Sequence, residues 1–385
     1  MNIAIIGGGI GGLTLAVALK RKNPAAQVAI YERDASSFAR PQGYALGLKG
    51  DGGLKVLTTL GLRDEVLADD AVKVTNFAFT DQAGKELLAL PAKDESRITY
   101  RVQREHLKKV LLNAIGDTPL HFGKTCVGYG NTDGKAIVHF EDGQDVVADY
   151  VIACDGVASA IRQQMIGDEK HYLGLSAIVG FAPIQVDHPL LSGGYFMTLG
   201  GNGSSLFAYR QPGGIHFSYT THASSEGDLA DLPRSMLREN LVEQTKDWHS
   251  LVREIIANTD ESSLLVRGYY DKQPIKKAHD GTVWLLGDAA HPMCPFQGQG
   301  ANMAMVDALA IADYLAAMQS ESAQPGSAAE LEPDIVKRGR KAVLESRNAA
   351  SQFHTTNRIK QFNRNIGFKI ANMVIRRSSA SQGKH

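Results

Sequence analysis

Residues 2–12 read NIAIIGGGIGG, and this stretch decides the fold. Its first five residues form a short apolar run typical of a buried strand, and a helical pattern follows the glycines. Gly7, Gly9 and Gly12 fit the pattern GxGxxG, in which backbone N–H groups approach a pyrophosphate at a helix N-terminus. Glu32 ends the next apolar run, VAIYE, where a carboxylate can bind ribose hydroxyls. These features together predict a dinucleotide-binding β-α-β unit. The alternative is an ordinary tight β-α turn.

The composition is that of an ordinary globular protein. Of the 385 residues, 43% are hydrophobic and 21% are charged, which permits a sizeable core. Lys plus Arg and Asp plus Glu number 41 each, so a zero formal charge argues against broad binding of nucleic acid. The three cysteines are scattered and form no metal-binding pattern, as expected of a reduced, cytoplasmic protein. We expect neither a signal peptide nor a membrane span, because no basic leader and no long apolar run occur.

The pattern of the chain changes along its length. Buried strands and helical periods alternate up to about residue 169, with a β-meander between 120 and 150. Residues 170–275 are short alternating runs separated by glycine turns, which predicts an antiparallel sheet. We therefore predict an α/β protein with a discontinuous nucleotide-binding domain, residues 1–169 and 276–318. A β-sheet substrate domain, residues 170–275, is inserted in it, and residues 334–377 form a C-terminal helical segment.

Two further motifs follow buried strands. The first, CDGVASAIR (154–162), places Asp155 at the carboxyl end of a strand, where the ligands of parallel sheets bind. The second, GDAAHPMCPFQGQGAN (287–302), places Asp288 similarly, so its carboxylate can reach a sugar hydroxyl. In the second motif Pro295 fixes a bend, and the later glycines let backbone approach a planar ligand. A capped helix start or a glycine-rich loop explains each residue singly, but explains them poorly together.

Together GGGIGG, CDGVASAIR and GDAAHPMCPFQGQGAN resemble the three fingerprints of the single-component FAD-dependent aromatic hydroxylases. These are the group A flavin monooxygenases typified by p-hydroxybenzoate hydroxylase. The motifs span residues 7–307 in the family order. The resemblance implies the FAD-binding Rossmann-like fold of that family, with an antiparallel substrate sheet and C-terminal helices. The positions that match its cofactor-binding residues are Gly7, Gly9, Gly12, Glu32, Arg33, Arg40, Arg104, Asp155, Gly156, Arg162, Gly287, Asp288, Pro295, Gly298, Gly300 and Asn302.

The resemblance also implies individual roles. The motif with Asp155 and Arg162 serves both FAD and the reduced pyridine nucleotide in that family. Asp288 matches the residue that holds the ribitol and ribose region of FAD, and Pro295 with its following glycines edges the isoalloxazine ring. Arg104 matches an arginine that contacts FAD, and Arg40 falls in a mobile flavin and substrate loop.

The reaction that the resemblance implies is a hydroxylation. NADPH or NADH reduces FAD, O2 adds to give a flavin C4a-hydroperoxide, and one oxygen atom passes to an activated ring carbon. The cofactor carries this chemistry, so we predict no catalytic protein residue and no metal ligand. For His291 we favour stabilisation of its loop over catalysis. Binding partners other than the aromatic substrate and O2 are not expected, and we expect a monomer.

The predicted substrate domain offers an aromatic, apolar surface that suits a planar phenolic or enolic ligand. The alternative is that these side chains pack the sheet against helices. The predicted substrate contacts are Met197, Phe207, Tyr209, His216, Pro295 and Phe296, and Tyr219 belongs to the same alternating runs.

Among subgroups, the short chain, IYERD and the motif at 287–302 resemble most the tetracycline-inactivating flavin monooxygenases. Met197 stands where those enzymes present a glutamine to the substrate, and the next hairpin lacks their arginine. His216 matches. A tetracycline-type antibiotic is therefore one candidate substrate among phenolic and polycyclic compounds.

Other classes of flavoprotein fit less well. A flavin halogenase would carry a WxWxIP motif, and an amine oxidase would lack CDGVASAIR. A membrane-associated quinone-pathway hydroxylase or a partner-binding flavoprotein is the remaining alternative, motivated by an acid-free C-terminal segment. We favour instead a closing helix with a solvated basic face and expect no integral membrane association. The segment combines the cations Arg358, Lys360, Arg364, Lys369, Arg376 and Arg377 with the apolar residues Ile359, Phe362, Ile366, Ile370 and Met373.

Overall fold

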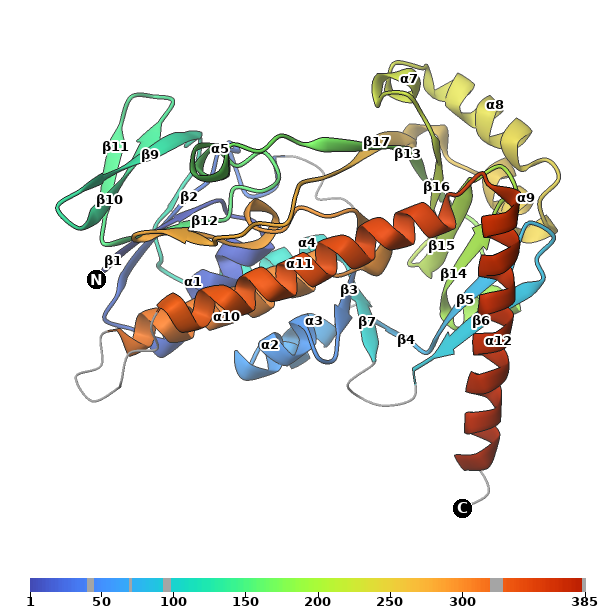
Figure 1. Ribbon diagram of the computed structural model, residues 1–385, viewed down its shortest axis with the longest axis horizontal. Coiled ribbons are helices and arrows are strands. Elements are labelled where there is room, and N and C mark those ends of the chain that lie inside the picture. The colour runs from blue at the N-terminus through green and yellow to red at the C-terminus, as the bar shows by residue number, and fades with distance from the viewer. Residues whose placement is uncertain (40–44, 69–70, 93–97, 319–327, 383–385) are drawn as a thin grey trace. The chain divides into compact units, whose positions relative to one another are not determined.

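A computed structural model describes residues 1–39, 45–68, 71–92, 98–318 and 328–382, with side chains described as far as Arg377 (Figure 1). Contacts group the chain into two compact units. The first consists of Met1–Ala71, Tyr100–His171 and Asp271–Arg347, and the second of Val72–Thr99, Tyr172–Tyr270 and Asn348–His385. The domain boundaries expected from the sequence stay a prediction. The contacts additionally group residues 72–99 and 348–385 with the second unit.

The first unit is built on a six-stranded sheet in the order β18-β19-β12-β1-β2-β8. All neighbouring strands are parallel except β18, which pairs with β19 in the antiparallel direction. Apart from their first residues, Asn2 and Tyr150, the central strands β1, β12 and β19 are apolar and buried, as expected for a sheet covered on both faces. The strands are β1 (Asn2–Ile6), β2 (Gln27–Tyr31), β8 (Leu120–His121), β12 (Tyr150–Ala153), β18 (His279–Asp280) and β19 (Val283–Leu285).

Helices complete the first unit. Helix α1 packs against α10 and α4 in one continuous apolar core with the sheet. The meander expected between residues 120 and 150 is present as the antiparallel strands β9, β10 and β11. The remaining bounds are α1 (Ile10–Lys22), β3 (Leu46–Lys49), α2 (Gly53–Thr59), α3 (Arg63–Ala68), α4 (Arg104–Ile115), β9 (Cys126–Thr132), β10 (Lys135–Phe140), β11 (Asp145–Ala148), α5 (Ala160–Ile166), α10 (Gly300–Ala317) and α11 (Ala328–Phe353), whose last turn belongs to the second unit.

The second unit is built on a seven-stranded sheet in the order β17-β13-β16-β15-β14-β5-β6. From β13 to β6 the neighbouring pairs are antiparallel as predicted, except β14 and β5, which are parallel. One face is closed by apolar residues of helices α8 and α9. The bounds are β5 (Asn76–Asp81), β6 (Glu86–Pro91), β13 (His171–Ala182), β14 (Gly194–Leu199), β15 (Ser205–Gln211), β16 (Gly214–His222), α8 (Arg234–Thr245), α9 (Ser250–Ala257) and β17 (Leu265–Asp271).

The last helix, α12 (Arg358–Gln382), runs beside the edge strand β6 of this sheet (Figure 1). Covering an edge strand in this way shields backbone groups that would otherwise pair with another chain. Within the described ranges, no helix combines the length and the apolarity that crossing a membrane requires.

Candidate functional site

The three sequence motifs meet at one edge of the first unit's sheet. Strand β12 lies between β1 and β19 and is parallel to both. The backbone N–H of Cys154 donates to Ile6 O at 2.6 Å, and that of Leu286 donates to Ala153 O at 2.9 Å. The segments that follow these strands therefore leave the sheet side by side. This carboxyl edge is where open parallel sheets bind their ligands.

The glycine turn after β1 leaves room for a phosphate group. A Cβ atom on Gly12 would lie 2.1 Å from the carbonyl oxygen of Gly7, so the turn requires glycine there. Gly9 is the N-cap of α1 and offers no side-chain hydrogen bond to the first turn of the helix. A Cβ on Gly9 would meet no atom within 4 Å. Open space in front of free helix N–H groups fits a pyrophosphate.

Glu32 is held beside this turn by backbone hydrogen bonds. One carboxylate oxygen accepts from the N–H of Gly8 at 2.7 Å, and the other accepts from the N–H of Asp34 at 2.9 Å. A carboxylate has further lone pairs, so it can still accept hydroxyl groups of a ribose. The next residue, Arg33, is exposed.

One carboxylate oxygen of Asp155, the first residue after Cys154 in the second motif, is buried and lacks a donor. This oxygen, Oδ1, has no hydrogen-bond partner in the part of the chain that the structure describes. Burial raises the pKa of Asp155 to about 6, although a hydrogen bond from Ser159 and the charge of Arg33 act in the opposite direction. Buried polar atoms are nearly always satisfied, so this oxygen fits a ligand hydroxyl. Gly156 follows it and has open space on its Cα.

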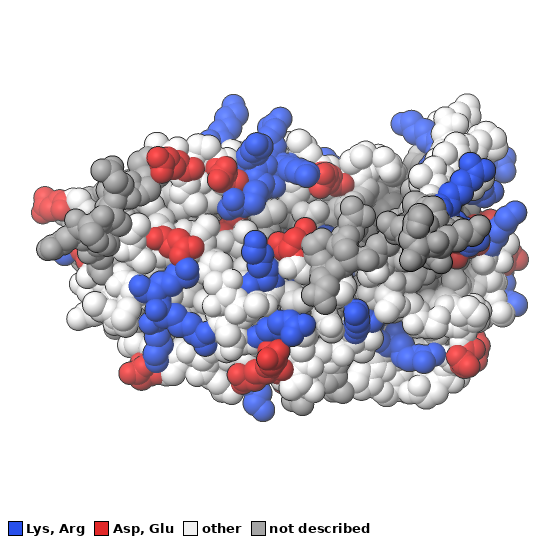
Figure 2. Space-filling view, turned by 90° about the horizontal axis from the view of Figure 1, so that it is seen from below, with Lys and Arg blue, Asp and Glu red and all other residues white. Residues whose placement is uncertain are grey.

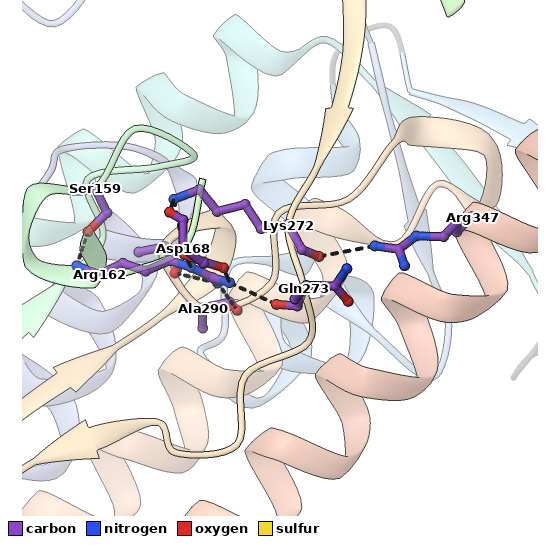
Figure 3. Close-up of polar contacts among 8 residues, drawn as sticks. Ser159, Arg162, Asp168, Lys272, Gln273, Ala290 and Arg347 are labelled. Atoms are coloured by element: carbon purple, nitrogen blue, oxygen red, sulfur yellow. Dashed lines mark hydrogen bonds and ion pairs between the residues drawn. The ribbon is translucent and has the colours of Figure 1, made fainter. Parts of the chain in front are cut away.

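Arg162 is completely buried, and its guanidinium connects the second motif to the third (Figure 3). Nη1 donates to the carbonyl oxygens of Ala289 and Ala290, at 3.1 Å and 2.6 Å. Nε and Nη2 donate to the carboxylate of Asp168, and Nη2 also donates to Gln273 O at 2.8 Å. These contacts use all five donors of the group. The geometry therefore gives Arg162 a positioning role, in which it holds the loop after β19.

The surroundings of Arg162 form a buried charge cluster (Figure 3). Burial would raise the pKa of Asp168, but the hydrogen bond and charge of Arg162, with help from Lys272, hold it below its usual value. Lys272 Nζ lies 3.3 Å from Asp168 Oδ1. The preceding residue, the buried Asp271, pairs with Arg347 of α11 at 2.7 Å. The cluster fixes the loop at Asp271–Gln273 and α11 to the second motif.

Asp288 is accessible to solvent, yet protein atoms surround it closely. Desolvation raises its pKa, and the charges of Arg104 and His291 oppose the shift. Both observations fit a carboxylate in a recess, next to the arginine at the start of α4. Gly287, which precedes it, adopts φ +62°. Asp288 and Arg104 are thus brought together from sequence positions far apart.

The loop that follows is clamped to β3 and α2. The side chain of Asn302 accepts hydrogen bonds from the N–H groups of Lys49 and Gly53 and donates to the carbonyl oxygens of Gly47 and Gly298. Lys49 Nζ donates to Gln297 O at 3.0 Å, and burial lowers the pKa of this lysine. The geometry therefore gives Asn302 a positioning role for the loop.

The segment from Pro295 to Gly300 exposes its backbone in the clamped loop. Pro295–Gln297 form a 3₁₀ turn, and Gly298 closes it with φ +58°, a conformation that L side chains rarely adopt. A Cβ on Gly298 would meet no atom within 4 Å. Phe296 lies in the same turn, and Gly300 begins α10. This arrangement fits a planar ligand lying against backbone.

His291 is buried and bonded to α10. Its Nε2 lies 3.1 Å from Asp307 Oδ2, and Arg338 of α11 donates to Asp307 Oδ1 at 2.8 Å. A Cβ on Gly339 would overlap the imidazole, so α11 packs directly on the ring. These contacts favour a role for His291 in stabilising its loop.

Of the predicted cofactor-binding residues, Arg40 lies outside the described residues.

In the second unit, the predicted substrate contacts share one face of the sheet. Met197 pairs with Phe207, and Tyr209 pairs with His216, and residues directly opposite on neighbouring strands point to the same side. The ring centroids of Phe207 and Tyr209 are 5.7 Å apart, and those of Tyr209 and His216 are 4.9 Å apart. We call this surface the aromatic face.

The structure adds three aromatic residues to this face and removes one. Phe77 and Phe79 of β5 and Tyr195 of β14 join it. The ring centroid of Phe77 lies 5.8 Å from that of Phe207, and the centroid of Tyr195 lies 5.8 Å from that of Tyr209. For Tyr219 the alternative applies, in which the side chain packs the sheet against helices. Tyr219 pairs with Leu206 and lies in the core under α8 and α9, because it stands three positions after His216 and successive side chains of a strand point to opposite faces.

The site's residues fit FAD. The glycine turn and Glu32 suit the pyrophosphate and ribose, the unsatisfied Asp155 Oδ1 and the recessed Asp288 suit sugar hydroxyls, and the loop at Gly298 suits a flat ring. The donor set is one of carboxylates and backbone amides. Within the described residues, no group of His, Cys, Asp and Glu could hold a metal ion.

Comparisons with known proteins agree with this geometry. A family model described as FAD binding domain matches residues 1–345. The 3-amino-4-hydroxybenzoate 2-monooxygenase of Streptomyces cremeus is 29% identical over 367 residues, which cover 92% of this chain and 88% of that protein.

Solved structures share the fold. Klebsiella pneumoniae HpxO complexed with FAD and uric acid has a TM-score of 0.83 at 24% identity, covering 96% of this chain and 92% of that chain. Tetracycline destructase Tet(51) has a TM-score of 0.63 at 20% identity, covering 97% of each chain. The predicted p-hydroxybenzoate hydroxylase-type fold is therefore confirmed. Because the family match covers most of the chain and similar proteins are monooxygenases by name, the protein belongs to the FAD-binding-domain family of flavin-dependent monooxygenases.

Proposed function

We propose that this FAD-dependent monooxygenase consumes NAD(P)H and O2 and hydroxylates an aromatic or polycyclic, phenolic or enolic small molecule. One oxygen atom enters the substrate and the other leaves as water, with two electrons taken from NADPH or NADH. FAD, when bound, supplies the activation of O2. The residues of the chain bind the cofactor, orient the substrate ring and exclude water.

The aromatic face is the observation that carries the substrate class. Tyr195, Phe207 and Tyr209 stand at tilted or edge-on angles with centroids 5.3–5.8 Å apart. Such surfaces accept a flat ring by offset or edge-to-face contact. His216, buried at the end of this row, can exchange a hydrogen bond with a phenol or an enol. A surface of aromatic rings with one convergent polar group is typical of sites for planar ligands.

The names of similar proteins support the same class. One relative acts on an aminohydroxybenzoate by its name, and HpxO was solved with uric acid, which is also flat. Tetracycline-type compounds stay candidates, since Tet(51) shares the fold. Pro295 and Phe296 stay proposed substrate contacts from the flavin loop, on the strength of the family resemblance.

The test is a screen of the purified FAD-loaded protein with phenols, quinolones and tetracyclines. A substrate is expected to accelerate the NADPH- or NADH-dependent bleaching of the flavin absorbance and to yield a product heavier by one oxygen atom. Comparing the KM for NADPH with that for NADH in the same assay identifies the electron donor. Failure of every aromatic class, with a non-aromatic compound oxidised instead, would contradict the proposal.

Two matched substitutions then test the face itself. Tyr209→Phe removes a hydroxyl from the aromatic face, and Tyr219→Phe removes one from the opposite, helix-covered face of the same sheet. We expect the first to change substrate KM or the position of hydroxylation and the second to change neither. His216→Ala should raise substrate KM while FAD affinity stays unchanged. Equal kinetic effects of the two tyrosine variants would show that the face does not bind substrate.

A further inference from the structure

The inner side of α12 is fixed to the edge of the second unit's sheet. Asn372 accepts from the N–H of Ala89 at 3.1 Å and donates to Glu86, and Arg376 pairs with Glu86 at 2.6 Å. The ring of Phe368 packs on Phe79, with centroids 5.3 Å apart. These contacts determine which side of the helix faces the sheet and which faces away.

The start of the helix is fixed as well. His354, just before it, bonds Ser205 through Nε2 at 2.9 Å, and its carbonyl accepts from His222 at 2.6 Å. Burial lowers the pKa of His354 to about 4, so the ring is neutral near pH 7 and Nε2 accepts the Ser205 hydroxyl. Arg364 donates to the carbonyls of Gln352 and Phe353 at 3.1 Å each. The outward side of α12 therefore has a defined orientation.

That outward side is apolar and exposed. Six large side chains recur at spacings of one, three or four residues, and they are between 40% and 71% exposed. Their Cα atoms span about 22 Å along the helix at about 1.5 Å per residue. Scattered exposed apolar residues are normal on proteins, but a continuous row of this length marks an interaction surface. We call it the outer stripe, formed by Ile359, Phe362, Ile366, Ile370, Met373 and Val374.

Cations without anions border the outer stripe. At about 100° per residue, Lys360 and Lys369 fall on opposite borders of it, and Arg358 and Arg377 lie at its ends. All four are exposed. No Asp or Glu occurs after Glu345. By contrast, cations and anions are interspersed over the left and central parts of the view in Figure 2.

We propose that the outer stripe docks this protein on the surface of an anionic lipid bilayer. A second copy fits poorly, because pairing two stripes would bring their cations together with no acid to offset them. An interface of lipid headgroups and acyl chains satisfies both features, since it takes apolar side chains and attracts Lys and Arg. The stripe is also a convex helix surface, which can lie in the plane of a bilayer and needs no groove. The helix would lie on the membrane without crossing it.

The experiment is flotation of the FAD-loaded full chain with vesicles. Phosphatidylcholine vesicles are compared with vesicles that also contain phosphatidylglycerol, each at low and high salt. We expect binding only to the anionic vesicles, weakened by salt through screening of the cations. Ile366→Gln/Ile370→Gln should weaken binding about tenfold or more, and Lys360→Gln/Lys369→Gln roughly thirtyfold.

A matched pair of variants controls for general loss of apolar surface. Met236 and Val242 are exposed on α8 to an extent similar to Ile366 and Ile370, so Met236→Gln/Val242→Gln should bind vesicles like the unchanged protein. FAD content and thermal midpoint are measured for every variant to confirm folding. The proposal is overturned if the protein does not bind vesicles. It is also overturned if Ile366→Gln/Ile370→Gln and Met236→Gln/Val242→Gln lose vesicle binding equally. A third result would overturn it: analytical ultracentrifugation shows that the protein self-associates, and Ile366→Gln/Ile370→Gln abolishes this self-association. The outer stripe would then bind a second copy of the chain.

Discussion

The replacement of Arg162 by methionine separates two roles for this residue. The family resemblance assigns its motif to both FAD and the reduced pyridine nucleotide, whereas its five donors all bond protein atoms. Methionine keeps most of the volume and removes the charge. Asp168 then loses its bidentate partner, and the carbonyls of Ala289, Ala290 and Gln273 lose their donors. The loop that presents Asp288 loses its main anchor to the second motif.

The size of the effect follows from the buried pair. Removing one partner of a buried ion pair costs about 3–5 kcal/mol. Lys272 still neutralises part of the Asp168 charge, so we expect the lower end, about 3 kcal/mol. The thermal midpoint should fall by about 6–12 °C, at roughly 2–4 °C per kcal/mol for a unit of this size. FAD affinity should fall about tenfold, which corresponds to roughly 1.4 kcal/mol.

The assays are guanidinium unfolding of the apoprotein and titration of flavin fluorescence. Arg340→Met is the control, because Arg340 is an exposed arginine on α11. Lowered stability and lowered FAD affinity in Arg162→Met alone would support the positioning role. If both quantities stay unchanged and only the KM for NADPH or NADH rises, the reasoning from geometry is refuted and Arg162 contacts the nucleotide.

Three further substitutions address the cofactor site. Asp288→Ala should weaken FAD binding about ten- to hundredfold through loss of charge-assisted hydrogen bonds, and an unchanged affinity by fluorescence titration would show a misassigned role. The folded-state pKa of Asp155 is raised to about 6, so folding favours its protonated form. The unfolding free energy of the apoprotein should therefore fall by roughly 1–3 kcal/mol as pH rises from about 4 to 6, and Asp155→Asn should remove this fall. The unfolding free energy is measured by urea denaturation at each pH. If its pH profiles for the unchanged protein and for Asp155→Asn run parallel, the prediction is contradicted. Asn302→Ala breaks four hydrogen bonds of the flavin loop and should lower the unfolding free energy by about 2–4 kcal/mol. If the variant and the unchanged protein unfold at the same denaturant concentration, Asn302 does not hold the loop.

The local parts of the cofactor site were determined by the sequence itself. Strand, glycine turn and helix follow from an apolar run that breaks into Gly7–Gly12, because backbone conformation and burial leave local patterns. The acids after β2, β12 and β19 were likewise readable, since parallel strands that each end in a ligand residue place those residues at one edge. The short alternating runs and glycine turns of residues 170–275 likewise predicted the antiparallel second sheet, because alternating burial along a strand is a local pattern.

Only the tertiary structure decided how distant segments pair. Strand β5 joins β14 from more than a hundred residues away and brings Phe77 and Phe79 to the aromatic face, although no local signal marks that pairing. The register that excludes Tyr219 from this face depends on hydrogen bonds between strands, and a shift of one residue exchanges the two faces. The carbonyl partners of Arg162 lie 111 to 128 residues further along the chain, so the motif CDGVASAIR alone could not predict them. Sequence patterns report the environment of a side chain, whereas its particular neighbours are chosen when the whole chain packs.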